Sequence, residues 1–330
     1  MNADAPPARK GTLRVLAAAS SGGHFKQLVR LVPRVPDVGD VTWVTYDAGL
    51  AEDLLRSAGR ADNRLVYVPY AAPRDLRNLT RDAWSIRGLL REDSYDLVVS
   101  TGAGIAVAAL PVARLHRARA VFVESATRVT EPSLSGRILQ RVPGVELCTQ
   151  QLEGPSFGPR WRRVGSVHDD FTPGDERSLT ALRRVVVTLG TIRPYGFRRL
   201  LERLVAILPS DAEVLWQTGA SDVDGLDIDA RDTVPGPELE AAMDEADVVV
   251  AHAGTGTALT AFERGRCPVL VPRRHAHGEH VDDHQVGTAR ALAARGLATY
   301  AEVEEVTEEL LLRAAARTVT QRPERVQLEL

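Results

Sequence analysis

Short runs of β-branched and other apolar residues recur along the chain, and each leads into a turn or a segment of helical length. Such runs predict buried strands. In the first half the predicted strands are residues 13–19, 41–46, 64–70, 96–100, 120–124, 145–149 and 162–167. Strands that alternate with helices predict an α/β fold with a parallel sheet covered on both faces.

The same pattern starts again after a polar stretch with proline and glycine at residues 168–180, which predicts an interdomain linker. The predicted strands of the second half are residues 185–189, 213–217, 247–251, 268–271 and 297–300. We therefore predict a loose tail over residues 1–11 and two doubly wound, Rossmann-like domains, residues 12–167 and 181–330. A pair of such domains predicts a ligand cleft at the carboxyl ends of their strands.

Composition narrows the function classes. A net charge of -3 and the lack of a recognition motif argue against a nucleic-acid partner. Cys148 and Cys267 are far apart and have no companions, so neither a disulfide framework nor a cysteine zinc site is expected. Arg14 interrupts the apolar run near the start, which disfavours a signal peptide, and no run reaches the roughly 20 residues that span a bilayer. We expect a cytoplasmic protein.

Glycine-rich turns follow several of the predicted strands. A turn of this kind brings helix N-terminal amides and a positive dipole end against a phosphate, and glycine permits close backbone approach. A single turn of this type is weak evidence, but four at strand ends in two domains are stronger evidence for ligand binding. The turns are Ser20-Ser21-Gly22-Gly23-His24, Thr101-Gly102-Ala103-Gly104, Thr188-Leu189-Gly190-Thr191 and His252-Ala253-Gly254-Thr255-Gly256-Thr257.

The second half resembles the donor half of glycosyltransferase family 28, which includes the N-acetylglucosaminyltransferase that forms lipid II. The resemblance lies in Ala246-Asp247-Val248-Val249-Val250, the turn at 252–257, Ala258-Leu259-Thr260 with Glu263, and Asp282-Asp283-His284-Gln285.

The first half resembles the acceptor-binding subunit of the dolichol-linked N-acetylglucosaminyltransferase and its bacterial exopolysaccharide relatives. The matching segments are Ser21-Gly22-Gly23-His24, Ser100-Thr101-Gly102-Ala103-Gly104, Glu124-Ser125-Ala126-Thr127-Arg128-Val129 and Pro132-Ser133-Leu134-Ser135-Gly136. In those relatives the two halves are often separate chains, so this chain resembles a fusion of both. The resemblance implies a GT-B fold and inverting transfer from a UDP-sugar (GlcNAc, glucose or glucuronate type) to a glycan, lipid-linked or small-molecule acceptor, with no metal or other cofactor.

The resemblance also implies roles for individual donor-site residues. Glu263 would accept hydrogen bonds from the ribose hydroxyls, and Val234 would present backbone groups to the uracil edge. Asp283, His284 and Gln285 occupy the positions that face the donor sugar. The remaining predicted donor-binding residues belong to the glycine-rich turns: Gly190, Thr191, His252, Gly254, Thr255, Gly256 and Thr257.

Arg193 has no counterpart that the family requires. A cation here could neutralise charge on the departing diphosphate without a metal. An arginine in a solvated loop is an equally good interpretation.

The base for the acceptor hydroxyl has two candidates. His24 lies on the first glycine-rich turn, and imidazole titrates near neutrality, as a general base requires. Glu124 ends a predicted strand and is the rival. Around them, the predicted acceptor-binding residues are Gly22, Gly23, Thr101, Gly102 and Gly104.

Two further segments allow more than one interpretation. Residues 273–284 are rich in histidine and carboxylate, but the resembling family is metal-free here, so we predict a polar lid and no metal. Residues 74–91 predict a helix with an apolar face and a face with arginines and Trp84. That second face suits either peripheral contact with an anionic membrane at the inner face of the plasma membrane or plain solvent.

Two other functions stay open at this point. One is a natural-product tailoring glycosyltransferase, as in antibiotic biosynthesis, with a small soluble acceptor. The other is a UDP-sugar epimerase, which would need acid and base groups around the sugar and no acceptor.

Overall fold

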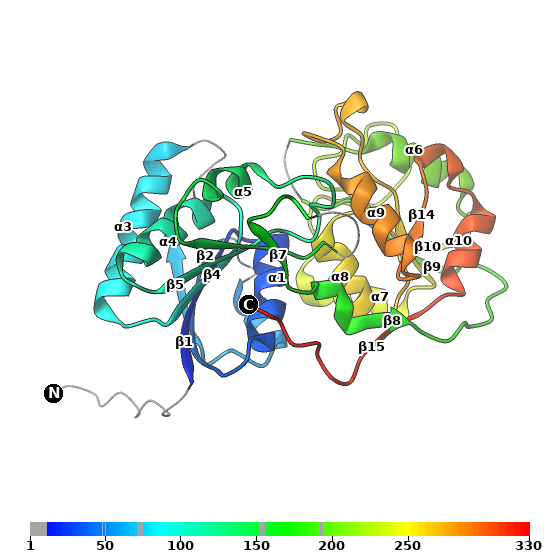
Figure 1. Cartoon of the computed structure of the whole chain (residues 1–330). Coiled ribbons are helices and arrows are strands. Elements are labelled where there is room, and N and C mark those ends of the chain that lie inside the picture. Colours follow the sequence, from blue (N-terminus) through cyan, green and yellow to red (C-terminus); the bar gives the residue numbers. More distant parts are fainter. Residues whose placement is uncertain (1–11, 48, 50, 71–74, 152–155, 192–193) are drawn as a thin grey trace. The chain divides into compact units, whose positions relative to one another are not determined.

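The computed structural model describes residues 12–47, 49, 51–70, 75–151, 156–191 and 194–330. They form two compact units (Figure 1). Unit 1 contains Met1–Ala126, Glu131–Val167 and Val326–Leu330, and unit 2 contains Thr127–Thr130 and His168–Arg325. The main boundary lies at the start of the predicted linker, but residues 127–130 and 326–330 each belong to the unit opposite to the predicted range.

Unit 1 is built on a seven-stranded parallel sheet of order β3-β2-β1-β4-β5-β6-β7. Its strands are β1 (Leu13–Ala19), β2 (Val38–Tyr46), β3 (Arg64–Val68), β4 (Leu97–Gly102), β5 (Arg119–Val123), β6 (Val145–Thr149) and β7 (Trp161–Arg163). Its helices are α1 (Gly23–Leu31), η1 (Val32–Arg34), α2 (Ala51–Ser57), α3 (Leu76–Glu92), α4 (Gly104–Leu115) and α5 (Leu134–Leu139).

Helices cover both faces of this sheet. Successive strand residues point to opposite faces, so neighbours along one strand pack against different helices. Val44 of β2 joins the buried cluster that contains Ile86 of α3 and Ile105 of α4. Its neighbour Trp43 meets Phe25 of α1, with ring centroids 5.9 Å apart. The nearly unbroken apolar runs seen in the sequence are therefore strands buried on both sides.

Unit 2 repeats the architecture with a six-stranded parallel sheet of order β11-β10-β9-β12-β13-β14. Its strands are β9 (Arg184–Thr188), β10 (Glu213–Gln217), β11 (Ala230–Arg231), β12 (Val248–Ala251), β13 (Val269–Leu270) and β14 (Thr299–Tyr300). Its helices are α6 (Arg198–Ile207), α7 (Gly236–Glu245), α8 (Thr255–Glu263), η3 (His275–His277), α9 (His284–Ala294), η4 (Val303–Glu305) and α10 (Glu308–Ala315). Val187 packs among the α6 and α10 side chains, and Val186 packs against α7 and α8 on the other face.

The predicted linker is folded. After η2 (Val167–Asp170), β8 (Phe171–Pro173) pairs antiparallel with β15 (Val319–Gln321). Phe171 is buried against Phe262 of α8, with ring centroids 5.3 Å apart. Strands β8, β11 and β15 were not predicted, because two or three residues are too few to show a period.

Each sheet has the strand order of a Rossmann-like domain, and this order locates a ligand site in each unit. In such sheets the order reverses between the first and fourth strands, and ligands bind beyond the carboxyl ends there. The reversal lies between β1 and β4 in unit 1 and between β9 and β12 in unit 2. All four predicted glycine-rich turns follow one of these strands.

Helix α3 confirms the predicted helix over most of its length. Ile86 and Leu90 are buried, whereas Trp84 is 67% exposed and lies under the Arg87 guanidinium at 5.4 Å. Arg74 and the side chain of Leu76 lie outside the described residues. Within the described part of the chain, no helix is long and apolar enough to cross a bilayer. Cys148 and Cys267 are both buried and free.

Asp82 is a fully buried carboxyl on α3, and it makes stability depend on pH. Tyr46 donates to Oδ2 at 3.1 Å, while Oδ1 has no hydrogen-bond partner among the described residues. Burial raises the pKa of Asp82 to about 6. An unfolded aspartate loses its proton near pH 4, so the free energy of unfolding should fall by about 3 kcal/mol as pH rises from about 4 to above 6.

We expect Asp82→Asn to lose this contribution, because the amide carries no charge at any of these pH values. Urea unfolding of the parent and the variant at pH 4.5 and 7.5 measures this contribution. The decrease in the free energy of unfolding from pH 4.5 to pH 7.5 should be smaller in the variant than in the parent. An unchanged difference between the two pH values would contradict the assignment.

Candidate active site

In unit 1 the two predicted turns are joined by hydrogen bonds across the point where the strand order reverses. Ser20 N donates to Gly102 O at 2.8 Å, and Ala103 N donates to Ser20 Oγ at 2.8 Å. Gly22 has φ 79° and precedes α1, and Gly102 has φ 103°, so both positions favour glycine. The predicted residues Gly22, Gly23, Thr101, Gly102 and Gly104 thus lie where β1 leads into α1 and where β4 leads into α4.

His24 is held against the end of β4 by two bonds to Thr101. Its Nδ1 lies 2.7 Å from Thr101 O, and Thr101 Oγ1 donates to His24 O at 2.8 Å. Because a carbonyl oxygen only accepts, Nδ1 carries the hydrogen. When the ring is neutral, its lone pair is therefore at Nε2, the nitrogen that a general base would use.

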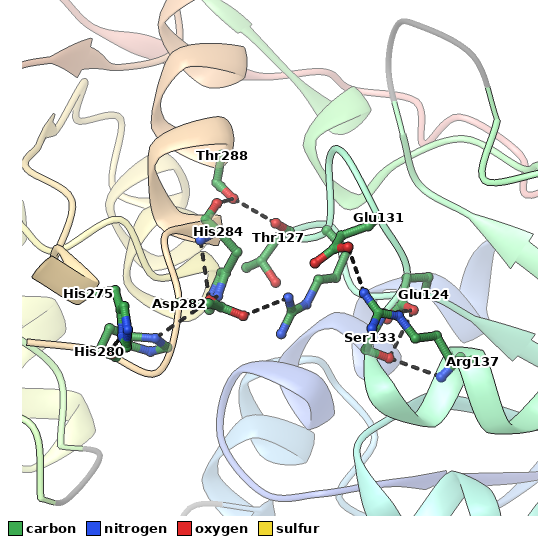
Figure 2. Close-up of polar contacts among 12 residues, drawn as sticks. Glu124, Thr127, Glu131, Ser133, Arg137, His275, His280, Asp282, His284 and Thr288 are labelled. Atoms are coloured by element: carbon green, nitrogen blue, oxygen red, sulfur yellow. Dashed lines mark hydrogen bonds and ion pairs between the residues drawn. The ribbon is translucent and has the colours of Figure 1, made fainter.

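Glu124 lies in a different environment from that of a catalytic base. Its side chain is 1% exposed. Ser125 N donates to Oε1 at 3.0 Å, and Ser133 N and Oγ donate to Oε2 at 2.8 and 2.9 Å (Figure 2). A Cβ at Gly136 would lie 2.5 Å from Oε2. The carboxylate therefore anchors the start of α5, which favours His24 over Glu124 as the base.

In unit 2 the two predicted turns enclose the ring of His252. A Cβ at Gly190 would lie 2.6 Å from His252 Cε1, and one at Gly254 would lie 2.4 Å from His252 Nε2. Gly190 also has φ 74°. Burial and the nearby Arg273 guanidinium together lower the pKa of His252 to about 3, so the ring is neutral and acts as a packing element between the turns.

Helix α8 begins directly after this ring, at the predicted Thr255-Gly256-Thr257. Gly254 is the N-cap and supplies no side chain to bond the first amides. Those amides have no intrahelical acceptor, and the helix dipole is positive at this end. The Thr255 hydroxyl is buried and has no hydrogen-bond partner among the described residues. This end of α8 has the donors that an anionic group needs.

Arg273 is a buried cation beside the turn that follows β9, and the sequence analysis did not predict it as a site residue. It is 1% exposed, and Nη2 donates to Leu189 O at 2.6 Å. Nε has no hydrogen-bond partner among the described residues. Burial lowers the pKa of Arg273 to about 10, so the side chain is still charged at neutral pH. A charged residue just after the buried strand β13 is the signal that could have identified it.

The other predicted donor residues divide into surface and buried positions. Thr191 and Asp283 are exposed, and Asp283 Oδ1 accepts from His275 N at 2.8 Å. Gln285 is buried, and its Oε1 accepts from Arg273 N at 3.0 Å. Glu263 is the half-buried last residue of α8.

Val234 N donates to Gln217 Oε1 at 2.9 Å, so a contact between Val234 and a base would use the carbonyl. Arg193 lies outside the described residues.

Residues 275–284 bring two histidines and one carboxylate together (Figure 2). The ligand atoms of His280, Asp282 and His284 lie within 4.8 Å of one another. His280 stacks on Tyr195 with ring centroids 5.5 Å apart, and burial lowers the pKa of His280 to about 4. Arg128 donates to Asp282 Oδ2 at 3.0 Å. At neutral pH the cluster therefore contains a neutral His280 and an Asp282 already paired with a cation.

Comparison with known proteins decides the family. The model of the glycosyltransferase family 28 C-terminal domain matches residues 184–326. Unit 2 is a glycosyltransferase family 28 C-terminal domain. This confirms the predicted family, and the predicted enzyme class of glycosyltransferase with it. The matched family is one of transferases, and a UDP-N-acetylglucosamine 2-epimerase shares the fold with a TM-score of 0.56 at 12% identity.

Relatives match the chain across both units. The chain is 27% identical over 305 residues to the UDP-N-acetylglucosamine--N-acetylmuramyl-(pentapeptide) pyrophosphoryl-undecaprenol N-acetylglucosamine transferase of Synechococcus sp. (strain RCC307), covering 86% of this chain and 81% of the relative.

Among solved structures, MurG of Acinetobacter baumannii has a TM-score of 0.54 at 19% identity, covering 91% of this chain and 89% of that one. The glycosyltransferase SnogD from Streptomyces nogalater has a TM-score of 0.56 at 20% identity, covering 92% and 94%. These likenesses confirm the predicted GT-B fold.

Proposed function

We propose that this family 28 glycosyltransferase transfers a sugar, with inversion, from a UDP-sugar to a hydroxyl group of a lipid-linked glycan precursor. The match to the Synechococcus relative covers most of both chains, and the name of that relative supports a UDP-sugar donor and a lipid-linked acceptor. GlcNAc, which that relative transfers by name, is the first sugar to test.

One observation supports this proposal most strongly: both units carry glycine-rich turns at the point where the strand order reverses, with complementary chemistry. Unit 2 offers the N-terminus of α8 and Thr255 to a diphosphate. Unit 1 offers His24, whose Nδ1 donates to Thr101 O, so that the neutral form of the ring has its lone pair at Nε2. An anion-binding turn and a base are the two groups that metal-free transfer requires.

We propose that no metal takes part in this reaction. The α8 N-terminus and the buried Arg273 supply positive potential near the assigned diphosphate position. Arg193, which was predicted as a further cation, remains part of this proposal without structural support.

UDP should stabilise the protein against heat, and Glu263→Ala should weaken UDP binding by about 1 to 3 kcal/mol, because ribose hydroxyls lose their acceptor. Calorimetric titration with UDP, CDP and GDP measures the effect. Glu213→Ala is the matched control, since Glu213 is exposed at the amino end of β10, away from the turns. Equal affinity for all three nucleotides, unchanged in Glu263→Ala, would refute the uridine site.

A tailoring enzyme with a small soluble acceptor is the second candidate, supported only by the fold of SnogD. An acceptor panel separates the two: a polyprenyl-diphosphate sugar should accept the labelled sugar, whereas small aglycones should not.

A lipid-linked acceptor would be met at a membrane surface, and we propose that the exposed face of α3 contacts it, at the inner face of the plasma membrane. Arg77, Arg81 and Trp84 are exposed on this face. Trp84→Ala combined with Arg81→Glu should lower the fraction that floats with vesicles containing anionic lipid. Leu115→Ala, which alters another exposed apolar side chain, is the control. Equal flotation of the double variant and the parent would exclude this face.

A further inference from the structure

The segment Thr127–Thr130 follows β5 in the chain but belongs to unit 2. Thr288 Oγ1 donates to Thr127 O at 3.1 Å (Figure 2). Arg128 Nη1 donates to Asp282 Oδ2 at 3.0 Å. Val129 lies so close to Gly287 that a Cβ there would be 3.3 Å from its methyl group. All three contacts meet the start of α9 or the loop before it.

Asp282 bonds both Arg128 and His284. Its Oδ1 accepts from His284 Nδ1, while Arg128 occupies Oδ2. Burial opposes the charge on Asp282, but the hydrogen bond from His284 and the Arg128 guanidinium outweigh it and hold the pKa of that carboxyl well below its usual range. A charged carboxylate only accepts, so His284 Nδ1 carries the hydrogen and the neutral ring has its lone pair at Nε2.

The His284 ring stays neutral at neutral pH. Burial lowers the pKa of His284 although the bond to Asp282 opposes this, and the positive end of α9, where His284 is the first residue, also disfavours a charged ring. The side chain keeps 17% exposure, and Nε2 has no hydrogen bond to another described residue. His284 also lies close enough to His252 to influence its charge, which places it beside the turns of β9 and β12.

The same groups resemble a metal site, because His280, Asp282 and His284 converge. The charge of Asp282 is already met by Arg128, however, and its other oxygen is taken by His284. A metal would have to displace a guanidinium from a half-buried carboxylate. The arrangement therefore fits a fixed hydrogen-bond acceptor better than a cation ligand.

We propose that Arg128 and Asp282 are positioning residues that hold His284 as an acceptor, so that its Nε2 binds a hydroxyl hydrogen of the donor sugar. This rests on the proposed function, and it assigns part of sugar selection to a segment encoded in the first half of the chain.

Binding of UDP and of UDP-sugars to the full chain tests this step separately from the proposed function. Asp282→Ala should weaken the binding of UDP-GlcNAc or UDP-glucose about tenfold, which corresponds to the loss of one neutral hydrogen bond. The affinity for UDP should stay the same. His284→Gln should retain most of the sugar affinity because its amide oxygen still accepts, and His284→Ala should lose it. Asp211→Asn, at an exposed position before β10, is the control for a lost charge.

Two further measurements complete the test. Nitrogen NMR shifts of the His284 ring should report the Nδ1-protonated form in the parent and a mixture in Arg128→Gln. Transfer should persist in excess chelator, with no thermal stabilisation by zinc.

Equal UDP-sugar affinity in Asp282→Ala and the parent would overturn the positioning role. Zinc stabilisation that disappears in His280→Ala would instead identify a metal site. Failure of the parent to bind UDP at all would refute the proposed function itself.

Discussion

Replacing His24 with alanine should lower turnover about 100-fold or more, because the acceptor hydroxyl loses the base that removes its proton. UDP affinity should stay nearly unchanged, since the nucleotide is assigned to unit 2. Initial rates with saturating donor and acceptor, together with UDP titration, measure both effects.

Two variants make this test specific. His24→Asn keeps a short amide that can donate to Thr101 O but has no titratable nitrogen, so it should be as inactive as alanine while preserving the turn. His116→Ala replaces the C-cap residue of α4, which precedes β5 and so lies at the amino ends of the strands, and should retain full activity. Normal turnover in His24→Asn would exclude His24 as the base.

Glu124→Gln should lower the free energy of unfolding by about 2 to 4 kcal/mol. The NH2 group of the glutamine would face N–H or O–H groups that donate to the carboxylate in the parent, and two donors cannot bond each other. Three donors, from Ser125 and Ser133, converge on this side chain in a buried place. Urea unfolding measures the loss.

Kinetics on the same variant distinguish the structural role from the catalytic one. At a temperature where Glu124→Gln is fully folded, its turnover should fall far less than that of His24→Ala. A folded Glu124→Gln protein with the larger kinetic defect would transfer the base role to Glu124.

Local pattern was sufficient to predict most of the sheet. The predicted ranges of β1, β6 and β10 agree with the structure at both ends, and most of the other predicted strands overlap their strands closely. A buried parallel strand needs a run of apolar residues long enough to cross the core, and that requirement is visible in the sequence. β8 and β15 are too short to show such an apolar run. They pair with each other across nearly the whole of unit 2, so the sequence did not predict them.

The turns of the candidate site were also predictable. Parallel strands place their carboxyl ends at one edge, so a turn after β1 and a turn after β4 had to become neighbours once the strand order was known. His24 and Thr101 accordingly meet at 2.7 Å. In the structure the glycines at positions 22, 102 and 190 have positive φ, a conformation that few other residues adopt.

Charge and burial were decided by tertiary structure alone. In the sequence Arg273 and Arg274 are two adjacent loop arginines, yet Arg273 is buried at the end of β9 while Arg274 is not. Glu124 resembled a catalytic carboxylate until Ser133, nine residues later, was seen to donate to it. Arg128 and Asp282 are 154 residues apart, and no local rule pairs them. A strand or turn depends on neighbours along the chain, and the sequence determined these; the role of an ionisable side chain depends on which distant groups fold around it, and only the tertiary structure decided that.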